Sequence, residues 1–232
     1  KGNTFFSSHL EDENGIHWFA TLMGLFRLDM KQKNEKEQWK HWVNVPGDST
    51  SIPSNFLNGM CADPKEPNRY LWVSTRGAGF FRLDKESGRC VRYSTKDGLP
   101  NDYAMEIQSD ETGNLWISTN RGLSCFTPPT GEFPKGRFRN FTEADGLAGN
   151  EFDVNGSRKT SDGYLYFVGV KGNNWFKPAE VLTHEGPVPV RFTLLQVNNE
   201  PASFTTHSQI LNEDIAYSTE ITLTPDVRVV TI

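Results

Sequence analysis

The chain has 232 residues, of which 36% are hydrophobic, and a formal net charge of −5 at pH 7. A chain of this length buries a sizeable core in one large domain or in a domain and a half. Lys and Arg are scattered along it, which excludes the concentrated basic surface that nucleic-acid binding requires. No run approaches the roughly 20 apolar residues of a membrane span. We therefore expect any targeting or transmembrane segment to lie outside this chain.

Four similar segments recur along the chain. Each joins two strand-like runs through a turn, and they read IHWFATLMGLFRLD (16–29), YLWVSTRGAGFFRLD (70–84), NLWISTNRGLSCFTP (114–128) and YLYFVGVKGNNWFKP (164–178). Their shared aromatic positions are Trp18, Trp72, Trp116 and Tyr166, with spacings of 54 (18 to 72), 44 (72 to 116) and 50 (116 to 166) residues. This period is typical of a four-stranded blade of a β-propeller.

A polar turn precedes each aromatic position: DENG (12–15), DPKEPNR (63–69), DETG (110–113) and SDG (161–163). Asp accepts hydrogen bonds from the backbone of its own turn and Gly tolerates a positive φ, so these segments predict hairpins. The third repeat then predicts four strands, over 103–110, 114–119, 123–128 and 137–142.

Alternation along the second strand predicts the role of the tryptophans. Trp116 faces one side, whereas Leu115 and Ile117 face the other. Since neighbouring blades cover both sides of a middle strand, we expect each Trp to pack between blades, where burial contributes roughly 4–6 kcal/mol before entropy. Stacking on a sugar is the alternative role.

The order of the strands in a meander predicts one polar rim. The connection into the first strand and the turn between the second and third strands lie at the same end of a blade, and loops on a rigid scaffold commonly carry binding groups. The candidate ligand-binding residues at this rim are Arg76, Asn101, Asp102, Asn120, Arg121, Asn150, Glu151, Lys171 and Asn173. Amides, carboxylates and cations suit a polar, hydroxylated or anionic ligand, whereas each residue alone is also an ordinary solvated turn residue.

The cysteines and histidines show no pattern of a metal or catalytic site. Cys61, Cys90 and Cys125 are odd in number and have no CxxC spacing, so we expect small buried thiols, with one disulfide and a spare thiol as the alternative. The five histidines have neither metal-ligand spacing nor a nearby nucleophile motif. We expect no catalytic residue, metal or cofactor.

Three stretches carry a resemblance to a known family. GLPNDYAMEIQSDETGNLWISTNRGLSCFTP (98–128) resembles the two-component regulator propeller repeat of Bacteroidetes hybrid two-component sensors. RNFTEADGLAGNEFDVNGSRKTSDGYLYFVGVKGNNWFKP (139–178) resembles the last blade of that array, and PVPVRFTLLQVNNEPA (187–202) resembles the start of the β-sandwich domain named for three tyrosines.

The resemblance implies an all-β chain: part of a seven-bladed propeller, with about four four-stranded blades, followed by the beginning of an Ig-like β-sandwich. We expect blades over 1–50, 51–96, 97–144 and 145–178, a linker over 179–187 and a truncated sandwich over 188–232.

The resemblance also implies a function. Such receptors detect oligosaccharides in the periplasm, signal through one membrane helix to a histidine kinase and control polysaccharide-utilisation genes. It further implies the periplasmic part of an inner-membrane protein and a homodimer, formed through the sandwich or a propeller edge. Two alternatives are a carbohydrate-active propeller enzyme, either hydrolase or lyase, and a scaffold for protein–protein interaction.

Overall fold

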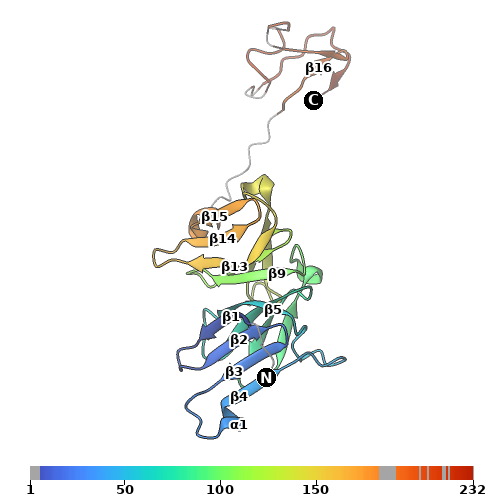
Figure 1. Ribbon diagram of the computed structural model, residues 1–232. Helices are drawn as coiled ribbons and strands as arrows, with labels where there is room; N and C mark the ends of the chain where they lie inside the picture. Colours follow the sequence, from blue (N-terminus) through green and yellow to red (C-terminus); the bar gives the residue numbers. More distant parts are fainter. Residues whose placement is uncertain are drawn as a thin grey trace. The chain divides into compact units, whose positions relative to one another are not determined.

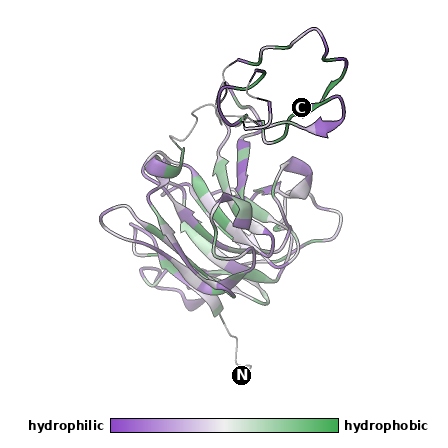
Figure 2. Ribbon diagram, turned by 90° about the horizontal axis from the view of Figure 1, so that it is seen from above, coloured by the Kyte–Doolittle hydropathy of each residue, from purple (hydrophilic) through white to green (hydrophobic). Residues whose placement is uncertain are grey.

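The computed structural model describes residues 6–182, 192–203, 205–207, 209–215, 218 and 220–231 (Figure 1). The chain divides into two compact units between residues 182 and 183. Almost all regular structure in the first unit is β, as the sequence predicts. Hydrophobic residues concentrate in its strands and hydrophilic residues in the connections (Figure 2).

The first unit contains four antiparallel sheets, each with its strands in chain order. Sheet 1 consists of β1 (Phe6–Glu11), β2 (His17–Thr21), β3 (Gly24–Leu28) and β4 (Trp39–Trp42). Sheet 2 consists of β5 (Leu57–Ala62), β6 (Tyr70–Thr75), β7 (Phe80–Asp84) and β8 (Cys90–Tyr93). Sheet 3 consists of β9 (Ala104–Ser109), β10 (Leu115–Thr119), β11 (Gly122–Thr127) and β12 (Arg137–Phe141). Sheet 4 has three strands among the described residues, one fewer than the predicted four: β13 (Phe152–Lys159), β14 (Leu165–Gly169) and β15 (Gly172–Phe176).

Short helical segments lie between these strands. The helix α1 (Glu35–Gln38) precedes β4, and α2 (Pro178–Leu182) follows β15. Two 3-10 turns, η1 (Thr95–Asp97) and η2 (Glu143–Asp145), lead into sheets 3 and 4. The first strands β1, β5, β9 and β13 contact one another in sequence, which is the arrangement of successive propeller blades.

Each tryptophan of the repeat packs on the next sheet. Trp72 lies in one buried cluster with Leu115 and Ile117 of sheet 3. Trp116 packs in the same way with Leu165 and Phe167 of sheet 4. We call the side of a sheet that carries the tryptophan its forward face and the opposite side its backward face. The predicted packing between blades is therefore confirmed for the tryptophans.

Tyr166, the fourth aromatic position, is 39% exposed, whereas Trp18 is 1% exposed and Trp72 and Trp116 are 0% exposed. Trp175 on the same forward face of sheet 4 is 62% exposed. In the described part of the chain, no further sheet packs on this face. Tyr166 thus lacks the partner that buries its three counterparts.

The predicted hairpin turns are present. In sheet 3 the aspartate of the turn also accepts a hydrogen bond from the tryptophan, which was not predicted from the sequence. In the turn of sheet 3, Asp110 Oδ1 accepts from the backbone N–H groups of Thr112 and Asn114, and Gly113 has a φ of 88°. The second oxygen, Oδ2, accepts from the indole N–H of Trp116 at 3.1 Å. In sheet 4 the equivalent positions hold Thr160 and Tyr166, and Thr160 Oγ1 accepts from the Tyr164 N–H at 3.1 Å.

The second unit contains one small sheet with the order β17-β16-β18. Its strands are β16 (Gln196–Val197), β17 (Glu200–Pro201) and β18 (Val230–Thr231). A hydrophobic cluster around Leu195, Val197 and Leu211 accompanies it. The sandwich over 188–232 stays a prediction, and most of the predicted linker, 183–187, lies outside the described residues.

Candidate functional site

The predicted rim is held together by a repeated backbone hydrogen bond between consecutive sheets. Its donor is a glycine in the turn between second and third strands, and its acceptor is a carbonyl in the loop that leads into the next sheet. The pairs are Gly24 N to Asn55 O (2.9 Å), Gly79 N to Asp102 O (2.8 Å) and Gly122 N to Asn150 O (2.7 Å). The loops of neighbouring sheets therefore lie side by side at one end of the unit.

Two of the candidate side chains hold these loops in shape. Asp102 Oδ1 accepts from the Thr95 N–H at 2.7 Å, and Asn150 Oδ1 accepts from the Glu143 N–H at 2.9 Å. Each bond spans seven residues and closes the loop around the 3-10 turn η1 or η2. These acceptors are part of the scaffold.

Arg76 and Asn101 are also tied to the scaffold. Arg76 donates from Nε to Asn58 Oδ1 at 2.8 Å, and the Asn58 amide in turn donates to the Ala104 carbonyl at 2.8 Å. Asn101 Oδ1 accepts from the Tyr103 N–H at 2.7 Å. Both residues are half-buried.

The remaining five candidates are exposed: Asn120, Arg121, Glu151, Lys171 and Asn173. Arg121 is positioned through its backbone N–H, which donates to Thr119 Oγ1 at 2.9 Å. Lys171 Nζ lies 2.9 Å from Glu143 Oε1, and this contact lowers the pKa of Glu143 and raises that of Lys171. The rim therefore presents amide, guanidinium, ammonium and carboxylate groups on a hydrogen-bonded frame.

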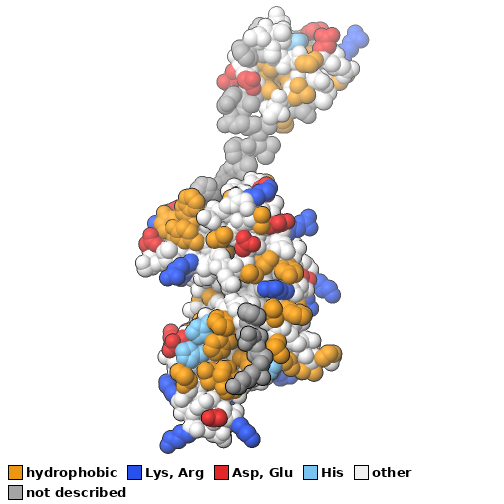
Figure 3. Space-filling model, viewed as in Figure 1, with side chains coloured by type: hydrophobic (Ala, Val, Ile, Leu, Met, Phe, Trp, Pro, Cys, Tyr) orange, Lys and Arg blue, Asp and Glu red, His pale blue; other side chains and the backbone are white. Residues whose placement is uncertain are grey.

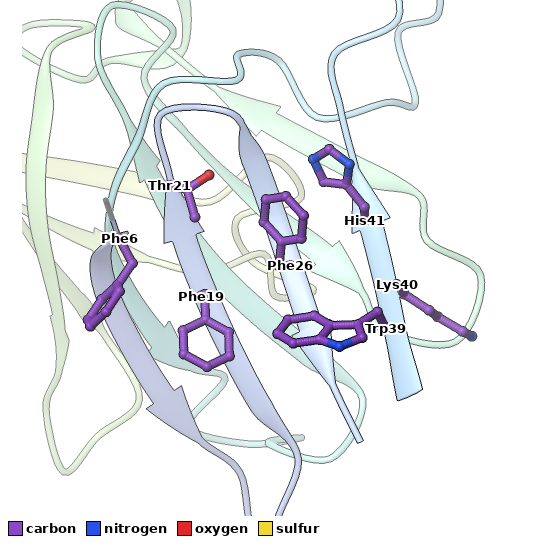
Figure 4. A pocket seen from close by; sticks show the side chains of 7 residues that line it. All are labelled: Phe6, Phe19, Thr21, Phe26, Trp39, Lys40 and His41. Carbon is purple, nitrogen blue, oxygen red and sulfur yellow. The ribbon is translucent and has the colours of Figure 1, made fainter. Parts of the chain in front are cut away.

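A second exposed feature, an aromatic surface on the backward face of sheet 1, was not singled out from the sequence. Phe6, Phe19, Phe26, Trp39 and His41 project from four strands around a cavity of about 470 Å³ (Figure 4). The Phe26 and His41 rings stack with centroids 3.9 Å apart. Figure 3 shows hydrophobic and histidine side chains gathered over this sheet.

The equivalent positions in the other sheets explain the aromatic surface. Val73 and Phe81 in sheet 2 correspond to Phe19 and Phe26, and both are 0% exposed because sheet 1 covers them. The aromatic surface thus has the composition of a face that packs on another sheet. The signal in the sequence was the alternation in HWFAT, which places Phe19 opposite Trp18.

All three cysteines are unpaired, as expected, and the prediction of buried thiols holds for Cys90 and Cys125, whereas Cys61 is half-buried. Burial raises the pKa of Cys90 and of Cys125 to about 12, so both are inert near neutral pH. Within residues 6–182 and the described parts of 192–231, no three His, Cys, Asp or Glu side chains lie close enough to hold a metal ion.

The fold and the site define an array of propeller-type blades with a polar rim. No family model matches this chain. "Histidine kinase P4" from Formosa agariphila is 28% identical over 152 residues, which are 64% of this chain and 10% of that protein. The chain thus spans about a tenth of this curated relative.

Two solved structures share the fold. The extracellular domain of BT4673 from B. thetaiotaomicron, assigned as a hybrid two component system, matches with a TM-score of 0.55 and 17% identity, over 92% of this chain and 38% of that chain. PorZ, an essential surface component of the type-IX secretion system of Porphyromonas gingivalis, matches with a TM-score of 0.54 and 17% identity, over 75% of this chain and 26% of that chain. The propeller-type fold and the resemblance to sensor regions are therefore confirmed. No helix in the described part of the chain is long and apolar enough to cross a membrane.

Proposed function

We propose that this chain belongs to the extracytoplasmic, ligand-sensing region of a hybrid two-component sensor. The observation that carries the proposal is the similarity to histidine kinase P4, which extends over 152 residues. In this proposal the chain lies in the periplasm, and a membrane helix outside residues 1–232 connects it to the kinase. Binding of oligosaccharides would then control genes for polysaccharide utilisation.

The exposed side chains of the rim are chemically suited to a polar, hydroxylated ligand. Arg121 and Asn120 follow β10 directly, and Asn173 lies in β15 of the next sheet. All three are exposed. The hydrogen bond from Gly122 N to Asn150 O joins the two sheets at this point, so little reorganisation is needed on binding. Amide and guanidinium groups donate to sugar hydroxyls or to a sugar carboxylate.

Titration calorimetry tests the binding role. The whole extracytoplasmic polypeptide is titrated with a panel of defined oligosaccharides. Arg121→Ala is expected to weaken binding about tenfold, which corresponds to the loss of one charged hydrogen bond. Arg89→Ala is the matched control, because Arg89 is exposed in a connection at the opposite end of sheet 2. Equal loss in both variants would contradict the rim assignment, and the release of product sugars would favour the enzyme alternative.

Dimerisation is a separate part of the proposal. A ligand shifts the arrangement of two subunits only if it binds the two arrangements with different affinity. Sedimentation of the same polypeptide with and without the bound oligosaccharide measures this coupling. A monomer under both conditions would contradict a dimeric sensor region without affecting the proposed binding at the rim.

A further inference from the structure

Two aromatic side chains are exposed at the rim, and neither is among the predicted ligand-binding residues. Phe56 is 55% exposed and Tyr103 is 37% exposed. Each directly precedes the first strand of its sheet, β5 or β9. The next residue, Leu57 or Ala104, is 0% exposed because it packs on the preceding sheet. Alternation turns the aromatic side chain away from that contact. Both rings are therefore accessible at the end of the unit where the predicted ligand-binding residues lie.

Backbone contacts join these two aromatic residues to turn residues of the rim. The Arg76 N–H donates to the Phe56 carbonyl at 2.9 Å, and the Asn120 N–H donates to the Tyr103 carbonyl at 3.4 Å. Arg76 of sheet 2 and Tyr103 of sheet 3 also form an antiparallel bridge. Four residues thus follow one another across sheets 2 and 3, and we call them the platform: Phe56, Arg76, Tyr103 and Asn120.

The backbone of each aromatic residue is fixed from both sides. In addition to the contacts of the two carbonyls, the Phe56 N–H donates to Ser54 Oγ at 3.0 Å. In the same way, the Tyr103 N–H donates to Asn101 Oδ1 at 2.7 Å. A ligand that stacks on these rings therefore orders little backbone when it binds, which lowers the entropic cost of binding.

Sheets 1 and 4 have different residues at the platform positions. In sheet 4 the Val170 N–H donates to the Glu151 carbonyl at 3.0 Å, so these two residues take the places of the amide and the aromatic ring. In sheet 1 Leu22 directly follows the second strand, as Arg76 does in sheet 2. The residue before β1 lies outside the described residues. Within the described part of the unit, aromatic rings and side-chain donors therefore alternate over sheets 2 and 3 alone.

The guanidinium group of Arg76 is held in place and keeps donors for a ligand. Its Nε donates to Asn58 Oδ1 at 2.8 Å, and Asn58 is 0% exposed. Among the described residues, neither Arg76 nor Arg121 forms an ion pair with a carboxylate. Beside Arg76, a Cβ atom on Gly77 would have no described atom within 4 Å, so the adjacent space is open. Two positive charges without a carboxylate partner in this part of the rim favour an anionic ligand.

The alternation of rings and donors matches a sugar with an acidic group. A pyranose ring has C–H bonds on its faces and hydroxyls at its edge, so a face packs on an aromatic ring while the edge forms hydrogen bonds. A guanidinium group binds two oxygens of one oxyanion through parallel hydrogen bonds. An apolar protein segment would instead bury the donors of Arg76 and Asn120 without acceptors, which costs binding free energy. The platform therefore favours an acidic sugar over an apolar partner.

We propose that the platform binds sugars that carry a carboxylate or a sulfate group. One sugar ring stacks on Tyr103, and its acidic group binds the guanidinium of Arg76. Phe56 contacts an adjacent sugar of the same oligosaccharide, and Asn120 forms a hydrogen bond with a hydroxyl. This inference rests on the proposed function, in which the rim binds oligosaccharides, and it adds the class of sugar and two aromatic contacts.

Paired oligosaccharides test the acidic class. The whole extracytoplasmic polypeptide is titrated by calorimetry with uronate-containing oligosaccharides and their carboxyl-reduced forms, and with sulfated oligosaccharides and their desulfated forms. We expect an acidic oligosaccharide to bind and its neutral form to bind at least about tenfold more weakly. The pair that shows this difference identifies the group as carboxylate or sulfate. Equal or tighter binding of the neutral forms would overturn the inference and leave the proposed function intact.

Substitution of Tyr103 tests the stacking. Tyr103→Ala is expected to weaken binding of the preferred acidic oligosaccharide at least about tenfold, whereas Tyr103→Phe keeps the ring and should stay within about threefold of the natural polypeptide. Tyr164→Ala is the matched control, because Tyr164 lies before β14 at the opposite end of sheet 4. The Tm of each variant without ligand verifies that it is folded. Unchanged affinity in Tyr103→Ala, or an equal loss in Tyr164→Ala, would overturn the platform but not the proposed function.

Arg76→Gln separates contact with the ligand from a structural role. Gln retains a donor for Asn58 Oδ1 but has no charge. Affinity for the acidic form should fall at least about tenfold, while affinity for the neutral form should change less than about threefold. Equal weakening of both forms would show a purely structural Arg76 and overturn its assignment to the acidic group. If no oligosaccharide binds the natural polypeptide, the proposed function and this inference both fail, and the two aromatic side chains serve another kind of partner.

Discussion

Trp116 and Asp110 are joined by a hydrogen bond from the indole Nε1–H to the carboxylate Oδ2, at 3.1 Å. The same bond occurs in sheet 2, between Trp72 and Asp63 at 2.8 Å, and in sheet 1, between Trp18 and Asp12 at 3.1 Å. One carboxylate thus closes the hairpin turn and satisfies the only polar group of a ring buried between sheets. This pairing links local turn chemistry to the stacking of the blades.

Asp110→Ala is expected to destabilise the first unit by about 2 kcal/mol, since it leaves the buried indole N–H without an acceptor and removes the acceptor of the turn. Urea denaturation followed by tryptophan fluorescence measures the change. Asp162→Ala is the control, because Asp162 is exposed in the corresponding turn of sheet 4, where Tyr166 stands at the position of the repeat tryptophan. The expected order would be contradicted if both variants lowered the midpoint equally.

Lys85→Met is expected to lower the free energy of unfolding by about 3 kcal/mol. Lys85 Nζ lies 3.0 Å from Asp12 Oδ2, and the two side chains are 8% and 4% exposed, so removal of the cation leaves a buried carboxylate short of a partner. This ion pair also connects the turn of sheet 1 to sheet 2. Lys171→Met is the control. Its ion pair with Glu143 is exposed, and the denaturation midpoint should not change.

The pH dependence of Asp12 gives an independent check. Burial raises its pKa, but hydrogen bonds from Trp18 and Lys85 outweigh burial, and the pKa is lower than the ordinary 3.8. A lowered pKa stabilises the folded state above pH 3.8, and this contribution is lost as the pH falls through the folded pKa. The stability difference between the natural chain and Lys85→Met should therefore shrink below pH 4. A constant difference down to pH 2 would contradict the ion pair.

Gly122→Ala is expected to destabilise the chain far more than Gly172→Ala. Both glycines have positive φ, so both substitutions strain the backbone. At Gly122 the new Cβ atom would also lie 2.3 Å from the Phe141 carbonyl oxygen, whereas at Gly172 its nearest neighbour among the described residues would be the Ala148 Cβ atom at 3.5 Å. Thermal unfolding of the two variants of the 232-residue chain measures the difference. Equal decreases in Tm would mean that the contact between Gly122 and β12 adds nothing to the destabilisation.

Much of the fold was predictable because local patterns determine it. The strands expected over 114–119 and 137–142 correspond to β10 and β12, since alternation and turn residues act over a few positions. The bond between Asp110 and Trp116 was missed, although Asp12 and Trp18 have the same spacing of six residues. The repeated spacing is the signal for this bond, although closure of the turn is by itself a sufficient reason for an aspartate at this position.

The rim was harder to predict because a side chain's partner decides whether it is available to a ligand. Chain order placed the loops at one end, as the bonds between glycines and carbonyls show. It did not reveal that Asp102 and Asn150 accept from Thr95 and Glu143, each seven residues upstream. The repeat also predicted four strands in every blade, whereas sheet 4 has three strands among the described residues.

The buried carboxyl group of Glu106 makes stability depend on pH in the opposite sense to Asp12. It is 7% exposed on β9, and its oxygens accept from the Asn155 N–H at 2.7 Å and the Ser157 hydroxyl at 3.3 Å. Burial raises its pKa above the ordinary 4.5 and outweighs these two bonds. The folded state therefore binds more protons than the unfolded state just above pH 4.5, and this group makes stability fall as the pH rises through that window.

Glu106→Gln removes the titration while the amide oxygen still accepts from the Asn155 N–H. The stability of the variant relative to the natural chain should increase from pH 4.5 upward and become constant above the folded pKa of Glu106. Urea denaturation at several values between pH 4 and pH 8 measures this difference. If the curve of Glu106→Gln runs parallel to that of the natural chain, the buried carboxyl does not bind its proton more tightly in the folded state.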